Sequence, residues 1–240
     1  RTRGGMKVEI ITCRKGQTQS VVYDYLPREE GERPMALDVL LQAQATKLPD
    51  LSFRYGCRNR TCGLCTVDIN GKPRIACRAR VREGDKVSAM STLPVVRDMV
   101  STRDGIARQL RGRLPHTLRG NDLNVEAPSD YHALTACIEC YACLDHCPMH
   151  ARNLNSNGDE RDENDAYRWG SPFSLLKLQR IRLDPVASTS DKERALTAAK
   201  DLGLGICRDC PGCKCGVGID LKRKVIQPLL AADVQSTPKE

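Results

Sequence analysis

The chain has 240 residues and a formal net charge of +8, and it contains only two phenylalanines and one tryptophan. That length accommodates two domains of about 100–150 residues each, but their cores cannot rely on aromatic burial. No stretch approaches about 18 consecutive apolar residues, so we expect no membrane-spanning helix. The basic run between Arg97 and Arg119 has no interleaved aromatic residues, which argues against a nucleic-acid stacking surface and favours a solvated face.

The first part of the chain has the patterns of strands and tight turns. Alternating apolar and polar residues, and the hairpin signal Asn70-Gly71, mark its strands. The predicted strands are residues 6–13, 19–25, 66–69, 74–77 and 87–91. Residues 35–47 have helical spacing. A small mixed sheet with one helix, wrapped around a cysteine loop at 56–65, predicts a β-grasp domain over residues 1–95.

The rest of the chain has helical patterns interrupted by cysteine loops. We predict a helix over 95–114 and a connection over 115–129, which together make residues 96–129 a linker. Residues 130–240 then form a helical domain. Its predicted helices are residues 133–136, 173–183, 192–202 and 219–232. Residues 152–165 are polar and acidic, lack an apolar period, and are interpreted as an exposed loop.

Twelve of the thirteen cysteines fall into three groups with the spacing of iron–sulfur ligands. The first group reads C-x4-C-x2-C followed by a fourth cysteine, which is the plant-type 2Fe–2S pattern. Its members are Cys57, Cys62, Cys65 and Cys77. A zinc site is the alternative, but zinc ribbons favour paired C-x2-C knuckles. A disulfide framework is disfavoured because the cysteines are closely spaced and no secretory signal precedes them.

The second group, which ends in Cys147-Pro148, has the bacterial ferredoxin spacing C-x2-C-x2-C-x3-C-P. In two-cluster ferredoxins the fourth cysteine of this run ligates the other cluster. Exchanging one ligand between the second and third groups leaves no ligand missing. The predicted sets are Cys137, Cys140, Cys143 and Cys215 for a 4Fe–4S cluster, and Cys147, Cys207, Cys210 and Cys213 for the third cluster. We favour 4Fe–4S for the third cluster, with 3Fe–4S as the alternative.

The predicted fold class is therefore α+β, with an N-terminal β-grasp 2Fe–2S ferredoxin domain followed by an all-α domain that holds two further clusters. Three clusters in one chain indicate a relay for single electrons. A redox sensor with structural clusters is the alternative, although three clusters are more than a sensor needs. We identify no flavin site and no catalytic residue, so the chain is not expected to act on a substrate alone. Cys13 lies in a strand pattern and is interpreted as a small buried side chain.

The order of a 2Fe–2S domain, a linker and a two-cluster helical domain resembles the iron–sulfur subunit of succinate dehydrogenases and fumarate reductases. The resemblance covers nearly the whole chain and depends on short motifs in both domains. These motifs are Ser52-Phe53-Arg54, Cys62-Gly63-x-Cys65, Asn70-Gly71-Lys72, the run from Cys137 to Pro148, Tyr167 with residues 170–176, and residues 215–226. In that family the third centre is normally 3Fe–4S with longer cysteine gaps, and Arg208 stands here where the family has a histidine near quinone.

The resemblance implies an electron-transfer subunit of an oxidoreductase complex. Its partner would be an FAD-containing flavoprotein subunit, docked near the loop Arg58-Asn59-Arg60-Thr61. Electrons would pass to a quinone through a membrane-anchor subunit, or to another acceptor in a related soluble dehydrogenase or reductase. We expect a hetero-oligomer without nucleic acid, in the cytoplasm or peripheral on the inner face of a prokaryotic membrane.

Overall fold

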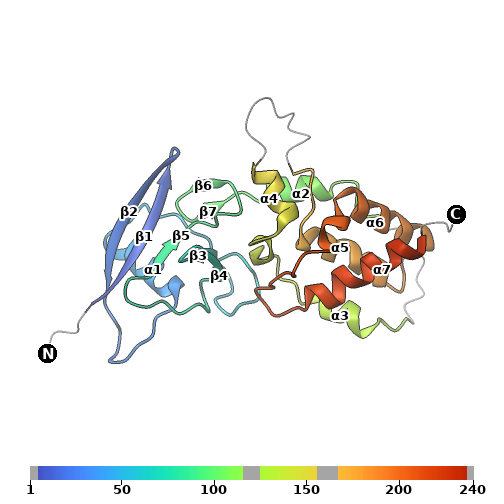
Figure 1. Cartoon of the computed structure of the whole chain (residues 1–240). Coiled ribbons are helices and arrows are strands. Elements are labelled where there is room, and N and C mark those ends of the chain that lie inside the picture. The colour runs from blue at the N-terminus through green and yellow to red at the C-terminus, as the bar shows by residue number, and fades with distance from the viewer. Residues whose placement is uncertain (1–4, 116–124, 156–166, 237–240) are drawn as a thin grey trace. The chain divides into compact units, whose positions relative to one another are not determined.

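The computed structural model describes residues 5–115, 125–155 and 167–236, and the chain divides into two compact units. The first unit holds the residues up to Arg103 together with 138–142, and the second holds Asp104–Cys137 and the chain from Cys143 onward. A mixed sheet characterises the first unit and helices the second, which confirms the predicted α+β class (Figure 1). Within those described ranges, no helix is both long and apolar enough to cross a bilayer.

The first unit is built on a five-stranded sheet with the order β2-β1-β5-β3-β4. Its strands are β1 (Met6–Arg14), β2 (Gln17–Tyr25), β3 (Thr66–Ile69), β4 (Lys72–Ile75) and β5 (Lys86–Ser88). The hairpins β1–β2 and β3–β4 are antiparallel, whereas β5 pairs parallel to β1. Helix α1 (Ala36–Thr46) buries an apolar face that includes Val39 and Leu40. The structure confirms the predicted hairpins and helix. They were predictable because each depends on a pattern within a short segment.

The predicted helix over 95–114 is wrong in its first half. Strands β6 (Val95–Arg97) and β7 (Val100–Ser101) form a short hairpin there, and helix α2 starts only at Asp104 and ends at Leu110. The cause is Asp98, which is fully buried with a left-handed φ of 47°. Its carboxylate accepts hydrogen bonds from Arg14 Nε at 3.1 Å and from the Ser52 amide at 2.9 Å. These distant partners fix a turn that the local sequence does not reveal.

Replacing Asp98 with alanine is expected to destabilise the first unit by about 2–4 kcal/mol, because a buried acceptor of charge-assisted hydrogen bonds is lost. Chemical denaturation followed by circular dichroism measures this loss. The matched control is Asp24→Ala, on the exposed side of β2, for which a change within about 0.5 kcal/mol is expected. Equal unfolding midpoints for the two variants would show that the Asp98 bonds do not stabilise the unit.

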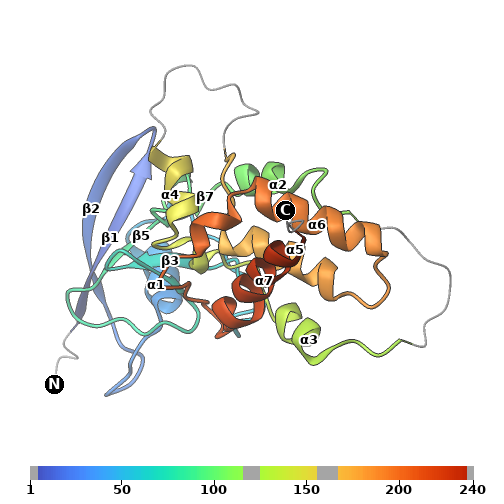
Figure 2. The ribbon, with the colours of Figure 1, turned by 45° about the vertical axis from the view of Figure 1, so that its right-hand side comes forward.

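The second unit is helical. After α2 come α3 (Ser129–Thr135), α4 (Pro148–Asn155), α5 (Pro172–Leu183), α6 (Thr189–Asp201) and α7 (Gln227–Ser236), with 3₁₀ turns η1 (Ala142–Leu144) and η2 (Leu204–Cys207) and a π-helical turn η3 (Lys222–Ile226). Helix α5 packs beside α6 and also contacts α3 and η3 (Figure 2). Ser171 caps α5 by accepting a hydrogen bond from the Ser174 amide, and Pro172 occupies the first turn.

Helix α4 was not predicted as a helix, and residues 152–155 at its end were assigned to a loop. Asn153 explains the miss, because this polar residue occupies the buried side of the helix. Its amide donates to the Trp169 carbonyl at 2.8 Å and accepts from the Trp169 amide at 2.9 Å. The predicted loop residues from 156 to 165 lie outside the described residues. The predicted helix over 219–232 instead begins with the π-helical turn and continues to Ser236.

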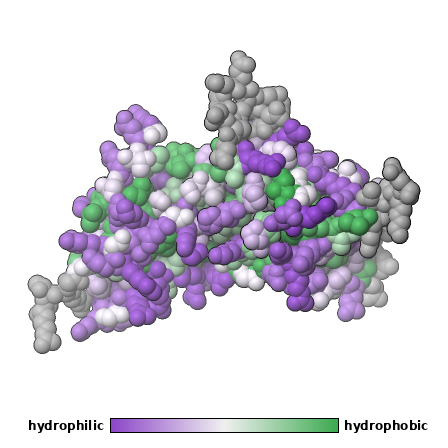
Figure 3. All heavy atoms as spheres, in the orientation of Figure 1, coloured by the Kyte–Doolittle hydropathy of each residue, from purple (hydrophilic) through white to green (hydrophobic). Residues whose placement is uncertain are grey.

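The surface in view is mainly hydrophilic. On the face drawn in Figure 3, hydrophilic residues cover most of both units, with smaller hydrophobic groups between them. The apolar side chains gather instead in the interiors, where the second unit has one cluster of buried residues from α4, α5, α6, η2, η3 and α7. That interior positions the cysteines of the second unit.

Candidate iron–sulfur sites

The first cysteine loop has the backbone shape of an anion-binding nest. Arg58 and Arg60 have left-handed φ values of 57° and 68°, which point successive N–H groups to one side of the loop. The amides of Asn59 and Thr61 donate to Cys57 Sγ at 3.4 and 3.2 Å. The Thr61 hydroxyl and these amides lower the pKa of Cys57 to about 6. The loop therefore stabilises a thiolate, which is the form that binds iron.

The four cysteines of the first group lie close enough to affect one another. Cys57 has a hydrogen-bonding interaction with Cys62, and Cys65 interacts with both Cys62 and Cys77. Burial raises the pKa of Cys65 to about 11, opposed by a hydrogen bond from the Cys77 amide. Several thiolates in this small space repel one another unless positive charge lies among them. This donor set, with N–H groups already directed at sulfur, fits a cluster with thiolate ligands.

The first cysteine loop packs directly against the second. Gly63 lies between ligands of the first group and has a left-handed φ of 65°. A Cβ added to it would lie 3.0 Å from the Cys140 amide nitrogen. A side chain at this position would also collide with the carbonyl oxygen of Ile138. These residues all belong to the first unit. Glycine is therefore needed where the two loop backbones meet.

The second loop has the same left-handed construction around one cysteine. Glu139 and Tyr141 have φ values of 55° and 60° on either side of Cys140, whose side chain is buried. Neither residue is glycine, so each conformation costs free energy that the surrounding contacts must offset. Cys140 is counted with the first unit, whereas Cys137 and Cys143 belong to the second.

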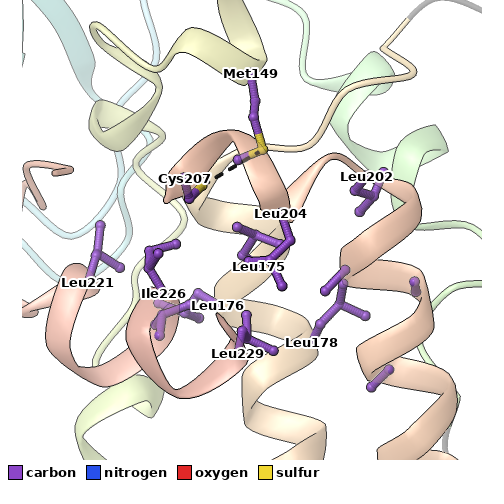
Figure 4. Close-up of a cluster of buried hydrophobic side chains, with 14 of the residues drawn as sticks. Met149, Leu175, Leu176, Leu178, Leu202, Leu204, Cys207, Leu221, Ile226 and Leu229 are labelled. Atoms are coloured by element: carbon purple, nitrogen blue, oxygen red, sulfur yellow. Dashed lines mark hydrogen bonds between the residues drawn. The ribbon is translucent and has the colours of Figure 1, made fainter. Parts of the chain in front are cut away.

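Six cysteines lie in or against the apolar core of the second unit. Cys147 and Cys207 are buried in it, and the others are partly buried at its edge. These others are Cys137, Cys143, Cys213 and Cys215. Figure 4 shows Cys207 next to Met149, with their sulfur atoms 4.0 Å apart, above the leucines of α5. The second and third cysteine groups, which are about 60 residues apart in the sequence, thus contribute side chains to one core.

The cysteines predicted for the third cluster interact electrostatically with one another. Cys147 lies just before α4, and its sulfur accepts hydrogen bonds from the amides of Met149 and His150. Burial nevertheless raises its pKa. Burial, and then repulsion from Cys147 and other thiols of the set, raise the pKa values of Cys207 and Cys213 to about 12. Cys210 contributes to the repulsion at all three sites. A polycationic cluster would remove this repulsion.

No described group of three or more histidine, cysteine, aspartate or glutamate side chains is arranged to hold a single metal ion. Cys13 is half-buried in β1 and lies outside the three groups. His150 is buried and packs near the Tyr167 ring. His146 is exposed and lies 3.5 Å from Asp145.

Comparison with known proteins agrees with the motifs. Residues 7–108 match the family model of a 2Fe–2S iron–sulfur cluster binding domain. The chain is 32% identical over 129 residues to the fumarate reductase iron–sulfur subunit of Escherichia coli. The aligned part covers 49% of this chain and 52% of that protein. The chain is similar to the iron–sulfur subunits of fumarate reductases. The resemblance inferred from the sequence is thereby confirmed.

Two further relatives cover more of this chain. An uncharacterized iron–sulfur protein of Methanocaldococcus jannaschii is 28% identical over 76% of this chain and 35% of its own length. A subunit of the fumarate reductase (CoM/CoB) of Methanothermobacter marburgensis is also 28% identical, over 76% of this chain and 34% of its own length. The chain thus spans between about a third and about a half of these curated relatives.

A solved structure matches the fold of the whole chain. A chain of the Mycobacterium smegmatis Sdh1 complex in the apo form is covered completely, with a TM-score of 0.79 and 23% sequence identity. At that identity the match shows the fold alone. The likeness in fold extends beyond the 2Fe–2S domain to the helical unit.

Two residues at the sites were missed because their sequence context gives no signal. Lys222, the first residue of η3, donates from Nζ to the carbonyl oxygens of Cys210 and Pro211 at 3.1 and 3.3 Å. Its charge also lowers the pKa of Cys213 against the larger effect of burial. Arg103 was included in the solvated basic run, but the structure places it half-buried against the first two cysteine loops. Neither spacing nor composition distinguishes these two cations from exposed ones.

Replacing Lys222 with methionine is expected to loosen the third cysteine loop, since charge-assisted hydrogen bonds to two carbonyls are lost at a cost of about 1–3 kcal/mol. The expected result is faster loss of iron from the third site to a chelator. Absorbance and EPR measure the rate of this loss. Arg223→Met is the matched control, because Arg223 is the exposed neighbour on the same turn. Identical rates of iron loss in both variants would contradict the bracing role of Lys222.

Proposed function

We propose that this chain is the iron–sulfur electron-transfer subunit of a succinate dehydrogenase or fumarate reductase type of oxidoreductase. The observation that carries the proposal is that successive cysteine groups contact each other within each unit. Gly63 of the first loop packs on Cys140 of the second, and Cys147 of the second group interacts with Cys207 and Cys213 of the third. Such contacts between successive groups suit a relay better than a set of separate structural sites.

The proposed ligands follow the sets predicted from the spacing. Cys57, Cys62, Cys65 and Cys77 would hold a 2Fe–2S cluster, and Cys137, Cys140, Cys143 and Cys215 a 4Fe–4S cluster. Cys147, Cys207, Cys210 and Cys213 would hold the third, for which we propose 4Fe–4S rather than 3Fe–4S. When bound, such clusters take up and release single electrons over a wide range of potentials.

The protein's own contribution is to hold and tune these sites. Amide donors at Cys57 and Cys147 stabilise negative charge on sulfur and so favour the reduced state. The core around Cys207 and Cys147 excludes water, and the low local dielectric strengthens electrostatic interactions with the nearby charges. Lys222 braces the third loop and adds positive charge beside it.

The partner would be an FAD-containing flavoprotein subunit, because the sites that we propose within the described residues are thiolate sites. The basic first loop, with Arg58 and Arg60 exposed, is the docking surface that we propose for it. The other partner would be a membrane-anchor subunit with quinone. A relative whose name specifies fumarate reductase (CoM/CoB) favours a second candidate, a flavoprotein reductase that does not use quinone.

The test is anaerobic purification of the chain with its native partners, followed by EPR. Addition of succinate is expected to produce the signals of reduced clusters, and fumarate should remove the signals produced by dithionite. A strong signal in the oxidised sample would assign 3Fe–4S to the third centre, and a silent oxidised sample would assign 4Fe–4S. Reoxidation of the reduced clusters by a quinone would support the first candidate, and failure of a quinone to reoxidise them would support the second. Zinc, or no acid-labile sulfide, would refute the proposal.

A further inference from the structure

Arg103 joins the first and second cysteine loops through three contacts. Its Nη2 donates to the Gly63 carbonyl oxygen at 3.0 Å, and its Nη1 to the Glu139 carbonyl oxygen at 3.4 Å. Its guanidinium also lies over the Tyr141 ring, with Cζ 4.8 Å from the ring centre. All of these residues belong to one compact unit. One planar cation thus reaches both loops at the place where their backbones meet.

These contacts fall on the left-handed parts of the two loops, which are strained at Glu139 and Tyr141. Gly63, Glu139 and Tyr141 all have left-handed backbone conformations. Arg103 binds the carbonyl of the first, the carbonyl of the second and the aromatic ring of the third. Strained conformations persist only where surrounding contacts determine them. Glu139 and Tyr141 flank Cys140, so the contacts of Arg103 fix the position of that cysteine from both sides.

The guanidinium is suited to this position because it is planar, with donors that point in fixed directions, and remains charged. Arg103 is half-buried, and burial lowers its pKa from the usual value. Electrostatic interactions with Tyr141, Cys140 and Glu139 act in the opposite direction, and nearby Arg54 adds to the lowering. A partly desolvated cation has a stronger field on its neighbours than an exposed one.

We propose that Arg103 is the positioning residue that fixes the first and second cluster loops against each other and, through its charge, raises the reduction potentials of both centres. The inference rests on the proposed function, since it assumes that the two loops hold redox clusters. A positive charge near a cluster favours the state with the additional electron. Arg103 acts through Gly63, Glu139 and Tyr141 and is not proposed as a cluster ligand.

The test compares Arg103→Gln and Arg103→Lys with the purified wild-type protein and its clusters intact. Glutamine removes both the charge and the planar donor pair, whereas lysine keeps the charge and loses the pair. The matched control is Arg80→Gln, which removes an exposed arginine of the same unit. Midpoint potentials of all three centres are measured by EPR during a titration with dithionite, and iron per chain is measured in parallel.

The expected result is a graded decrease of the first and second midpoint potentials, with the largest effect for glutamine. For glutamine we expect about a tenfold shift of the reduction equilibrium, which is 59 mV for one electron. The third centre and the Arg80→Gln protein should keep wild-type values. If glutamine prevents assembly of the first two clusters, a lysine variant with lowered potentials in them still supports the role.

Three outcomes would overturn the inference while leaving the proposed function intact. The first is wild-type potentials in both Arg103 variants. The second is loss of all three clusters in both variants, which would assign Arg103 to general folding. The third is an equal shift in Arg80→Gln, which would reflect net charge alone. Absence of clusters from the wild-type protein would instead refute the proposed function itself.

Discussion

Replacing Gly63 with alanine is expected to abolish the first and second centres together. The added Cβ would collide with the Ile138 carbonyl oxygen and lie 3.0 Å from the Cys140 amide nitrogen. Both obstacles are backbone atoms, so no side-chain rotation can relieve them. The left-handed φ of 65° adds about 1 kcal/mol for any residue with a side chain. With typical overpacking costs of about 1–3 kcal/mol, the expected loss is about 2–4 kcal/mol, concentrated in two cysteine loops.

Gly71→Ala separates the two costs. Gly71 has a φ of 72°, similar to that of Gly63. A Cβ added to Gly71 would have no atom within 4 Å other than those of its chain neighbours. This control therefore introduces the conformational cost without the collision, and we expect about 1 kcal/mol of destabilisation with all clusters retained. Iron and acid-labile sulfide per chain, together with EPR of the reduced protein, measure the outcome. Retention of both signals in Gly63→Ala would show that the two loops do not meet as tightly as the structure indicates.

The parts of the fold that were predictable from sequence have local causes. The β1–β2 and β3–β4 hairpins have alternating side chains, and a hairpin pattern contains its own turn residues. The cysteine groups were recognisable because a metal cluster requires its ligands at short, fixed separations, whatever the surrounding fold. Spacing of this kind can therefore be recognised from a single sequence.

The parts that could not be predicted depend on residues far apart in the chain. Asp98 turns the expected helix into a hairpin through Arg14, 84 positions away. Asn153 holds α4 through Trp169, and its polarity hides the helical period. In the sequence, Arg103 cannot be distinguished from the other cations of the basic run. In the folded chain it contacts two carbonyl oxygens and an aromatic ring. Such roles exist only in the folded chain.

Replacing Cys147 with serine is expected to remove the third centre and spare the second. Cys147 is the last cysteine of the second group, so a sequential assignment would make it a ligand of the second cluster. We propose exchange because Cys147 and Cys207 lie in one buried core, with Cys213 packed against it. Iron should fall from about ten to about six atoms per chain if all clusters have the proposed compositions.

Cys215→Ser is the reciprocal variant, and under the exchanged assignment it should remove the second centre while the third remains. Cys13→Ser is the control, since Cys13 lies outside the three groups, and it should retain all iron. EPR of the reduced proteins distinguishes which centre is lost in each case. If Cys147→Ser removed the second centre and Cys215→Ser the third, each group would serve its own cluster. The core that unites Cys147 with Cys207 would then stabilise the fold without joining the two sites through a shared ligand set.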